Sequence, residues 1–162
     1  MRSIAIGLLG IVLVHGGAAA QTIEEQAQVL RDFEHQVASY TLQLTCLDPA
    51  HAAVATPPRI FTLPVAMVFR QLIAKALDEQ GAATAVRGVG SAGSLHPPAV
   101  LEPFPADELF QFPQVLASAL PALPGPLEYR LIGNDLVLRD ARNDVVAGVL
   151  QDAVGTVATV KR

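Results

Sequence analysis

The stretch LEYRLIGNDLVLRDARNDVVAGVL, residues 127–150, decides the fold. It holds three short runs that are typical of β-strands, at residues 127–131, 136–139 and 145–150. The first run alternates apolar and polar side chains, as a strand with one buried face should. Gly133-Asn134 is a tight-turn pair, and residues 140–143 supply a second turn. We therefore predict a three-stranded antiparallel meander over residues 127–154, with one buried face.

The chain before the meander predicts a long amphipathic helix over residues 22–47. Its apolar side chains recur at spacings of three and four, which is the helical period. They are Ile23, Ala27, Leu30, Phe33, Val37, Tyr40, Leu44 and Leu47. Thr22 and Glu25 match a capping box at the start of this helix. Asp48-Pro49 is expected to end it.

A second helix is predicted over residues 63–80. Its apolar face is broad and consists of Val65, Val68, Phe69, Leu72, Ile73, Ala76 and Leu77. Thr62 is placed to cap the first turn, where Pro64 is tolerated, and Gly81 is the expected terminator. The connector between the two helices is long enough for them to pack as an antiparallel pair.

Residues 81–126 are rich in Gly, Ser and Pro. The part from 81 to 105 predicts a long irregular loop, which in a compact domain is either mobile or a binding surface. A short helix follows, with Pro113 at its start and Pro121 as its stop. Its apolar positions are Val115, Leu116 and Leu120. A stiff proline-rich spacer then leads into the meander.

The first twenty residues have the composition of an export signal. Arg2 gives a short positive region, residues 4–14 are an apolar run, and Ala18-Ala19-Ala20 supply a small-residue cleavage site. The run is shorter than the roughly 20 apolar residues of a membrane-spanning helix. We predict cleavage after Ala20 and a periplasmic or secreted mature protein with no stable membrane anchor.

The mature chain, residues 21–162, is long enough for one domain with a core and too short for two ordinary ones. We predict an α+β fold in which two long amphipathic helices pack on a short C-terminal antiparallel β-meander, with a Gly/Pro-rich loop between. Its three parts are the helical residues 21–80, the loop and short helix at 81–126, and the meander at 127–154.

Charge and cysteine content narrow the function classes. Removal of Arg2 leaves a formal charge of about −5, and most basic residues stand alone. Nucleic-acid binding needs clustered positive charge, so it is disfavoured. Cys46 is the only cysteine, which excludes an intramolecular disulfide. Two interpretations of Cys46 stay open: a small buried apolar residue, or an intermolecular disulfide or reactive thiol.

The segment GVGSAG, residues 88–93, matches the glycine fingerprint of dinucleotide-binding proteins. That fingerprint works when a strand delivers the glycines and a helix begins at the third. Here the preceding residues are the end of a helix and a loop, and Pro97-Pro98 follows soon after. We therefore interpret the match as a loop of small residues and predict no cofactor.

No catalytic pair emerges from the sequence. The glycine that a nucleophile elbow requires two residues before Ser91 is replaced by valine. Ser94 and His96 are two residues apart in a loop, a spacing that fixes no geometry. His35 and Cys46 are separated by roughly 16 Å of helix axis. We predict that the protein is not an enzyme and assign no catalytic residue.

Metal ligation has only partial support. Cys46, Asp48 and His51 lie close together at a helix end and could form part of a site, whereas His35 and His96 are dispersed. Three aspartates of the meander stand in or beside turns, at Asp135, Asp140 and Asp144. In turns, Asp side chains accept local backbone hydrogen bonds. We assign no metal-binding or cofactor-binding residue.

Two resemblances accompany these patterns. The segment LEYRLIGNDLVLRDARNDVVAGVLQDAV (127–154) and the LPALP spacer before it resemble the end of a group of uncharacterised exported bacterial proteins. The stretches DFEHQVASY (32–40) and IFTLPVAMVFRQLIAKAL (60–77) are similar to the two helices of that group. The hairpin is more distantly similar to RcnB-like periplasmic proteins linked to nickel and cobalt homeostasis. That likeness implies a periplasmic accessory role, although this chain lacks a histidine-rich tract.

These observations favour an exported, non-enzymatic accessory or protein-interaction module. A three-stranded sheet offers limited cover to two helices, so we expect excess apolar surface that favours a protein partner or a homodimer. The alternative is a periplasmic carrier of a small ligand or metal, with the loop at 81–105 as its lid.

Overall fold

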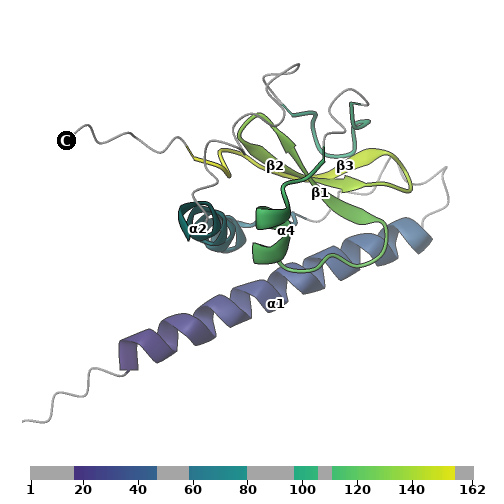
Figure 1. Ribbon diagram of the computed structural model, residues 1–162. Helices are drawn as coiled ribbons and strands as arrows, with labels where there is room; N and C mark the ends of the chain where they lie inside the picture. Colours follow the sequence, from purple (N-terminus) through teal and green to yellow (C-terminus); the bar gives the residue numbers. More distant parts are fainter. Residues whose placement is uncertain (1–16, 47–58, 80–96, 106–110, 156–162) are drawn as a thin grey trace, which may run out of the picture.

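The computed structural model describes residues 17–46, 59–79, 97–105 and 111–155. Within these residues, three helices precede three strands. Figure 1 shows their arrangement. The helices are α1 (Gly17–Cys46), α2 (Leu63–Glu79) and α4 (Gln114–Ala119). The strands are β1 (Leu127–Ile132), β2 (Asp135–Asp140) and β3 (Val145–Leu150). The α+β class and the C-terminal meander predicted from the sequence are confirmed.

The sheet has the order β1-β2-β3 with both pairs antiparallel. Ile132 pairs with Asp135 across the predicted two-residue turn, and Gly133 has a φ of 59° there. Glycine reaches this left-handed conformation without the strain that a Cβ would add. The register of β2 on β3 shifts between Leu138 and Arg139. The conformation of the turn residues therefore determines how β1 pairs with β2.

The helices cover one face of the sheet (Figure 1). An aromatic cluster packs between the helices and the sheet. The Phe69 ring on α2 lies 4.7 Å from that of Phe33 on α1 and 5.4 Å from that of Phe61, centroid to centroid. It also lies 6.3 Å from Tyr129 on β1. Burying rings of this size supplies much of the hydrophobic free energy of a small core. Phe69 therefore links both long helices to the sheet.

The opposite face of the sheet is also buried, which corrects the prediction of one buried face. A second apolar cluster contains Phe104, Ile132, Val137 and Val146. Residues 101–104 pair with the outer edge of β3, where Leu101 N donates to Val146 O and Val146 N donates to Glu102 O. Part of the predicted irregular loop is thus ordered cover for the sheet. Its remainder, at residues 81–96, lies outside the described residues.

The predicted start of α2 and both boundaries of α4 are confirmed, the start of α1 is corrected, and the predicted stops at Asp48-Pro49 and Gly81 lie outside the described residues. The Thr62 carbonyl accepts from Ala66 N at 2.8 Å, which places Thr62 at the cap of α2. Pro113 precedes α4 as expected. By contrast, α1 begins at Gly17, so Thr22 lies inside the helix and does not begin it. The helix extends backward because residues 18–20 are alanines, the best helix formers.

The two long helices do not form the antiparallel pair that the connector length allowed. Figure 1 shows α2 nearly end-on while α1 runs across the view, so the helices cross. A crossing lets both helices reach the sheet and lets α1 extend past it. In the described parts of the chain, no helix is long and apolar enough to cross a membrane.

Candidate functional site

The structure places few of the residues that the sequence offered for chemistry. The candidates outside the described residues are the GVGSAG segment at 88–93, Asp48, His51, Ser94 and His96. Cys46 is the last residue of α1, and His35 is exposed on the same helix. Among the residues that the structure describes, no group of three or more His, Cys, Asp or Glu side chains could hold a metal ion.

The three meander aspartates have different roles. Asp140 accepts hydrogen bonds from Arg142 N at 2.9 Å and Asn143 N at 3.3 Å, as expected of a turn aspartate. Asp135 likewise accepts from a backbone amide, that of Asp152. Asp144 instead binds the Arg139 guanidinium, with Nη2 of Arg139 at 2.6 Å from its carboxylate. The prediction of local backbone contacts is confirmed for Asp140 alone, because the amide that Asp135 binds is 17 residues away in the sequence and Asp144 binds a side chain.

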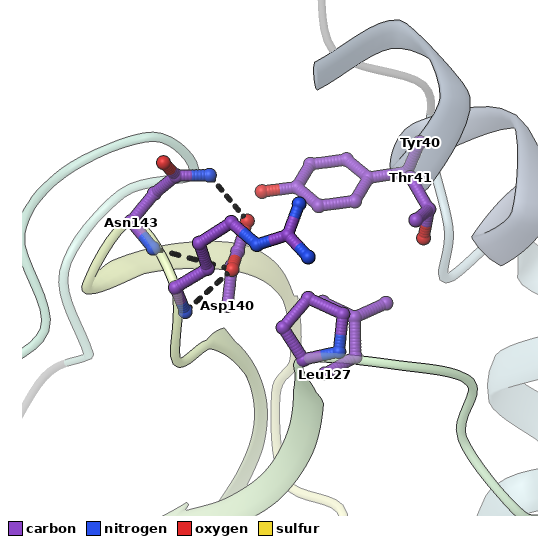
Figure 2. Close-up of a pocket in the computed structure, with 7 residues that line it drawn as sticks. Tyr40, Thr41, Leu127, Asp140 and Asn143 are labelled. Carbon is purple, nitrogen blue, oxygen red and sulfur yellow. Dashed lines mark hydrogen bonds between the residues drawn. The ribbon is translucent and has the colours of Figure 1, made fainter. Parts of the chain in front are cut away.

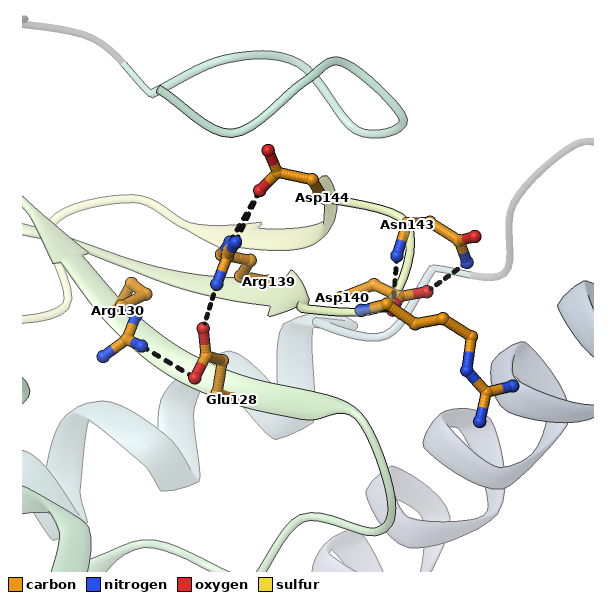
Figure 3. Close-up of polar contacts among 7 residues, drawn as sticks. Glu128, Arg130, Arg139, Asp140, Asn143 and Asp144 are labelled. Atoms are coloured by element: carbon orange, nitrogen blue, oxygen red, sulfur yellow. Dashed lines mark hydrogen bonds and ion pairs between the residues drawn. The ribbon is translucent and has the colours of Figure 1, made fainter. Parts of the chain in front are cut away.

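Arg139 is the centre of a charge network on the sheet (Figure 3). Its guanidinium binds Glu128 on β1 as well as Asp144, and Glu128 also pairs with Arg130 at 2.7 Å. The same guanidinium lies 5.4 Å from the centre of the Phe104 ring. These contacts join β1, β2, the β2–β3 turn and the segment that covers the far face. All its charges are paired, so we interpret the network as structural.

A small cavity lies between the second half of α1 and the start of the β2–β3 turn (Figure 2). Its volume is about 50 Å³, and it is lined by Tyr40, Thr41, Pro126, Leu127, Asp140, Arg142 and Asn143. Tyr40 and Asp140 are each only 2% exposed. Figure 2 shows the Tyr40 hydroxyl directed toward Asp140 and Asn143. Two buried polar side chains therefore face one small space.

The Tyr40 hydroxyl is buried and has no hydrogen-bond partner in the described structure. Buried polar atoms without a partner are rare, because the lost hydrogen bond to water costs about 1–3 kcal/mol. Asp140 has three donors, namely two backbone amides and Asn143 Nδ2 at 2.8 Å. All three are neutral, and no ion pair to Asp140 occurs among the described side chains. The cavity therefore contains a hydroxyl group without a hydrogen-bond partner and a buried carboxylate.

Burial raises the pKa of Tyr40 well above its ordinary value of 10.0, and the Asp140 carboxylate adds to the increase. Burial also raises the pKa of Tyr129, whose hydroxyl donates to Pro121 O at 3.0 Å. These are the only two tyrosines in the sequence. Both are therefore protonated in the folded protein at pH values where an unfolded chain loses the protons.

This difference predicts alkaline unfolding. The unfolded chain releases two tyrosine protons near pH 10 that the folded chain retains, so the unfolded state binds fewer protons and stability falls as pH rises. The stability that both tyrosines contribute is fully present below pH 10. Above it, the free energy of unfolding should fall by up to about 2.7 kcal/mol per pH unit.

Urea unfolding at a series of alkaline pH values measures this slope, with tyrosinate absorbance as a second readout. Tyr129→Phe should halve the slope. A free energy of unfolding that stays constant well above pH 10, or tyrosinate absorbance that appears in the folded protein at pH 10, would contradict the burial of the two hydroxyls.

A second surface feature lies where α1 meets the start of α2. A groove of about 420 Å³ is lined by Val29, Asp32, His35, Gln36, Thr62, Pro64 and Val65. On the first two turns of α2, Leu63 is 74% exposed and Met67 is 54% exposed. The two residues are four apart and so share one helix face. Neither lines the groove, but Pro64 and Val65 of the same helix turns do.

Sequence reasoning identified neither feature as a site. In the sequence, Tyr40 belongs to the apolar stripe of its helix and Asp140 to a turn, and no motif or spacing joins the two residues across a hundred positions. Leu63 and Met67 did fall outside the predicted apolar face of the second helix, which was the one available signal.

Comparison of the chain with protein-family models, curated proteins and solved structures finds no match.

Proposed function

We propose that the chain is an exported, non-enzymatic accessory module that binds a partner protein at the groove between α1 and the start of α2. The observation that carries the proposal is the exposure of Leu63 and Met67 on one face of the same α2 turns that contribute Pro64 and Val65 to the groove. Single exposed apolar residues are normal on a protein surface, whereas neighbouring ones beside a groove are typical of an interface.

Charge around the groove favours a particular partner. Asp32 lines the groove, and Glu24, Glu25 and Glu34 are exposed elsewhere on α1. A partner segment with apolar anchors and basic side chains would match both the apolar residues and the acidic ones. A second copy of this chain would bring the same acidic helix to the contact. We therefore favour a different protein over a homodimer.

The double variant Leu63→Ser with Met67→Ser tests this proposal. Removing two large anchors from an interface typically costs more than about 2 kcal/mol, or at least a thirtyfold loss of affinity. Tagged protein purified from the periplasm should lose its copurifying partner, as measured by quantitative mass spectrometry. Leu42→Ser is the matched control, because Leu42 is 65% exposed on α1 and lies outside both helix segments, 29–36 and 62–65, that contribute to the groove. Equal recovery of partners by the two variants would contradict the proposal.

Export is part of the same proposal and has its own measurement. The intact mass of the protein recovered from the periplasm should correspond to a chain that starts at Gln21. Cleavage there would remove the first four residues of α1 and leave Thr22 near the new helix start. Full-length protein confined to the cytoplasmic fraction would contradict export.

The carrier alternative is supported by a separate feature. The cavity between Tyr40 and Asp140 contains an unpartnered hydroxyl and a buried carboxylate, which are the kind of convergent polar groups that orient small ligands. This support concerns a small organic ligand and does not involve the histidines.

A further inference from the structure

We propose that the cavity between Tyr40 and Asp140 binds a hydroxyl group of a small neutral polyol, such as the end of a saccharide. The inference names a ligand class for the carrier alternative and rests on it; it does not depend on the protein contact at α2. The inference rests on three observations: the Tyr40 hydroxyl has no hydrogen-bond partner, the cavity is small, and charged side chains of both signs line it.

The hydrogen-bonding capacities of Tyr40 and Asp140 determine which chemical group of a ligand can bind between them. Tyr40 stays protonated, so its hydroxyl offers a proton that no described group accepts. The Asp140 carboxylate can only accept, and its three neutral donors leave about one of its four acceptor positions free. A group that joins the two must accept from Tyr40 and donate to Asp140. A hydroxyl does both, whereas an ammonium only donates and a carboxylate only accepts.

The volume limits what enters the cavity. A water molecule takes about 30 Å³ in the liquid, so a space of about 50 Å³ accommodates one hydroxyl with little more than its carbon. The rest of a ligand would lie outside the cavity. Pro126 and Leu127 also line the cavity, and their apolar atoms suit the C–H surface of a polyol.

The charges at the cavity favour a neutral ligand over an ion. Asp140 is negative, and Arg142 lines the same space with a positive guanidinium. Asp140 would attract a cation and Arg142 would repel it. An anion would be attracted by Arg142 and repelled by Asp140. A neutral polyol meets no such conflict, and its further hydroxyls can accept from Arg142.

Two-dimensional ¹⁵N–¹H NMR tests the inference on the full mature protein. The backbone amides of Arg142 and Asn143 donate to Asp140, so their chemical shifts report directly on what binds the carboxylate. The probes are glycerol, glucose and methylammonium chloride, each added stepwise to high millimolar concentration. We expect saturable shifts of these two amides with glycerol or glucose and none with methylammonium.

Two phenylalanine variants make the test specific. Tyr40→Phe removes the unpartnered hydroxyl and should weaken polyol binding about tenfold, the equivalent of one hydrogen bond. Tyr129→Phe is the matched control, because the Tyr129 hydroxyl already binds Pro121 O away from the cavity. This variant should bind the polyol as the unchanged protein does.

The other outcomes overturn the inference in distinguishable ways. Saturable shifts with methylammonium alone would refute the polyol class but leave a small-ligand carrier supported. No saturable shift with any probe would mean that ordered water alone fills the cavity, and the carrier alternative would fail with it. Equal polyol binding by Tyr40→Phe would place the ligand elsewhere.

Discussion

Phe69→Ala should lower the free energy of unfolding by about 3–5 kcal/mol, the usual cost of removing a buried phenylalanine ring. Phe69 is fully buried, and its ring contacts aromatic rings from α1, from the residues just before α2 and from β1. No single neighbour can fill the space that the ring leaves. Because small domains have a total stability of about 5–15 kcal/mol, this variant should be close to unfolding.

Urea unfolding followed by circular dichroism measures the effect. Met67→Ala, two residues away on the exposed side of α2, is the control and should change stability by less than about 0.5 kcal/mol. If Phe69→Ala cost no more than this control, α2 could not be packed between α1 and the sheet as described.

Asp140→Ala should destabilise the fold by about 2–3 kcal/mol. The substitution removes the acceptor of three hydrogen bonds, two of them from backbone amides in the β2–β3 turn. Hydrogen bonds to a charged group contribute about 1.5–3 kcal/mol, and donors left without a partner near a buried surface add a desolvation cost. Water that enters the adjacent cavity offsets part of the loss.

Thermal and urea unfolding should both register this change. Asp140→Asn keeps an acceptor oxygen for the turn amides and should be less destabilising than Asp140→Ala. Asp78→Ala, at an exposed position of α2, is the control and should have little effect. A loss of stability for Asp140→Ala as small as that of Asp78→Ala would show that the carboxylate does not hold the turn.

The meander could be predicted because its determinants are local. A glycine at a left-handed turn position and strands of six residues on either side fix the pairing of β1 with β2 within fourteen residues. The start of α2 was equally local, since Thr62 and the apolar period are enough to place it. Such elements need no knowledge of the rest of the chain.

The cover on the far face could not be predicted in this way. Phe104 is one aromatic residue in a proline-rich stretch, and nothing nearby in the sequence shows that it packs on Ile132 and Val137. The pairing of residues 101–104 with β3 joins segments about forty residues apart. The alternation of β1 suggested a solvent-facing side because Glu128 and Arg130 are charged. In the structure these two side chains pair with one another.

The candidate sites depend on tertiary structure even more. Tyr40 and Asp140 meet only because α1 packs against the end of β2, and each has a satisfactory local explanation in the sequence. The exposure of Leu63 and Met67 was partly predictable, since both lie off the apolar face of their helix. The groove at the same turns of α2 is formed with α1 and could not be predicted.

Site-specific photocrosslinking in living cells tests the proposed protein contact most directly. A benzophenone amino acid at position 63 would occupy the exposed start of α2, and the same amino acid at position 42 is the control. The proposal predicts one discrete crosslinked partner from position 63, lost when Met67 is changed to Ser, and none from position 42. Crosslinks of equal yield from both positions, or none from position 63 in exported protein, would contradict it.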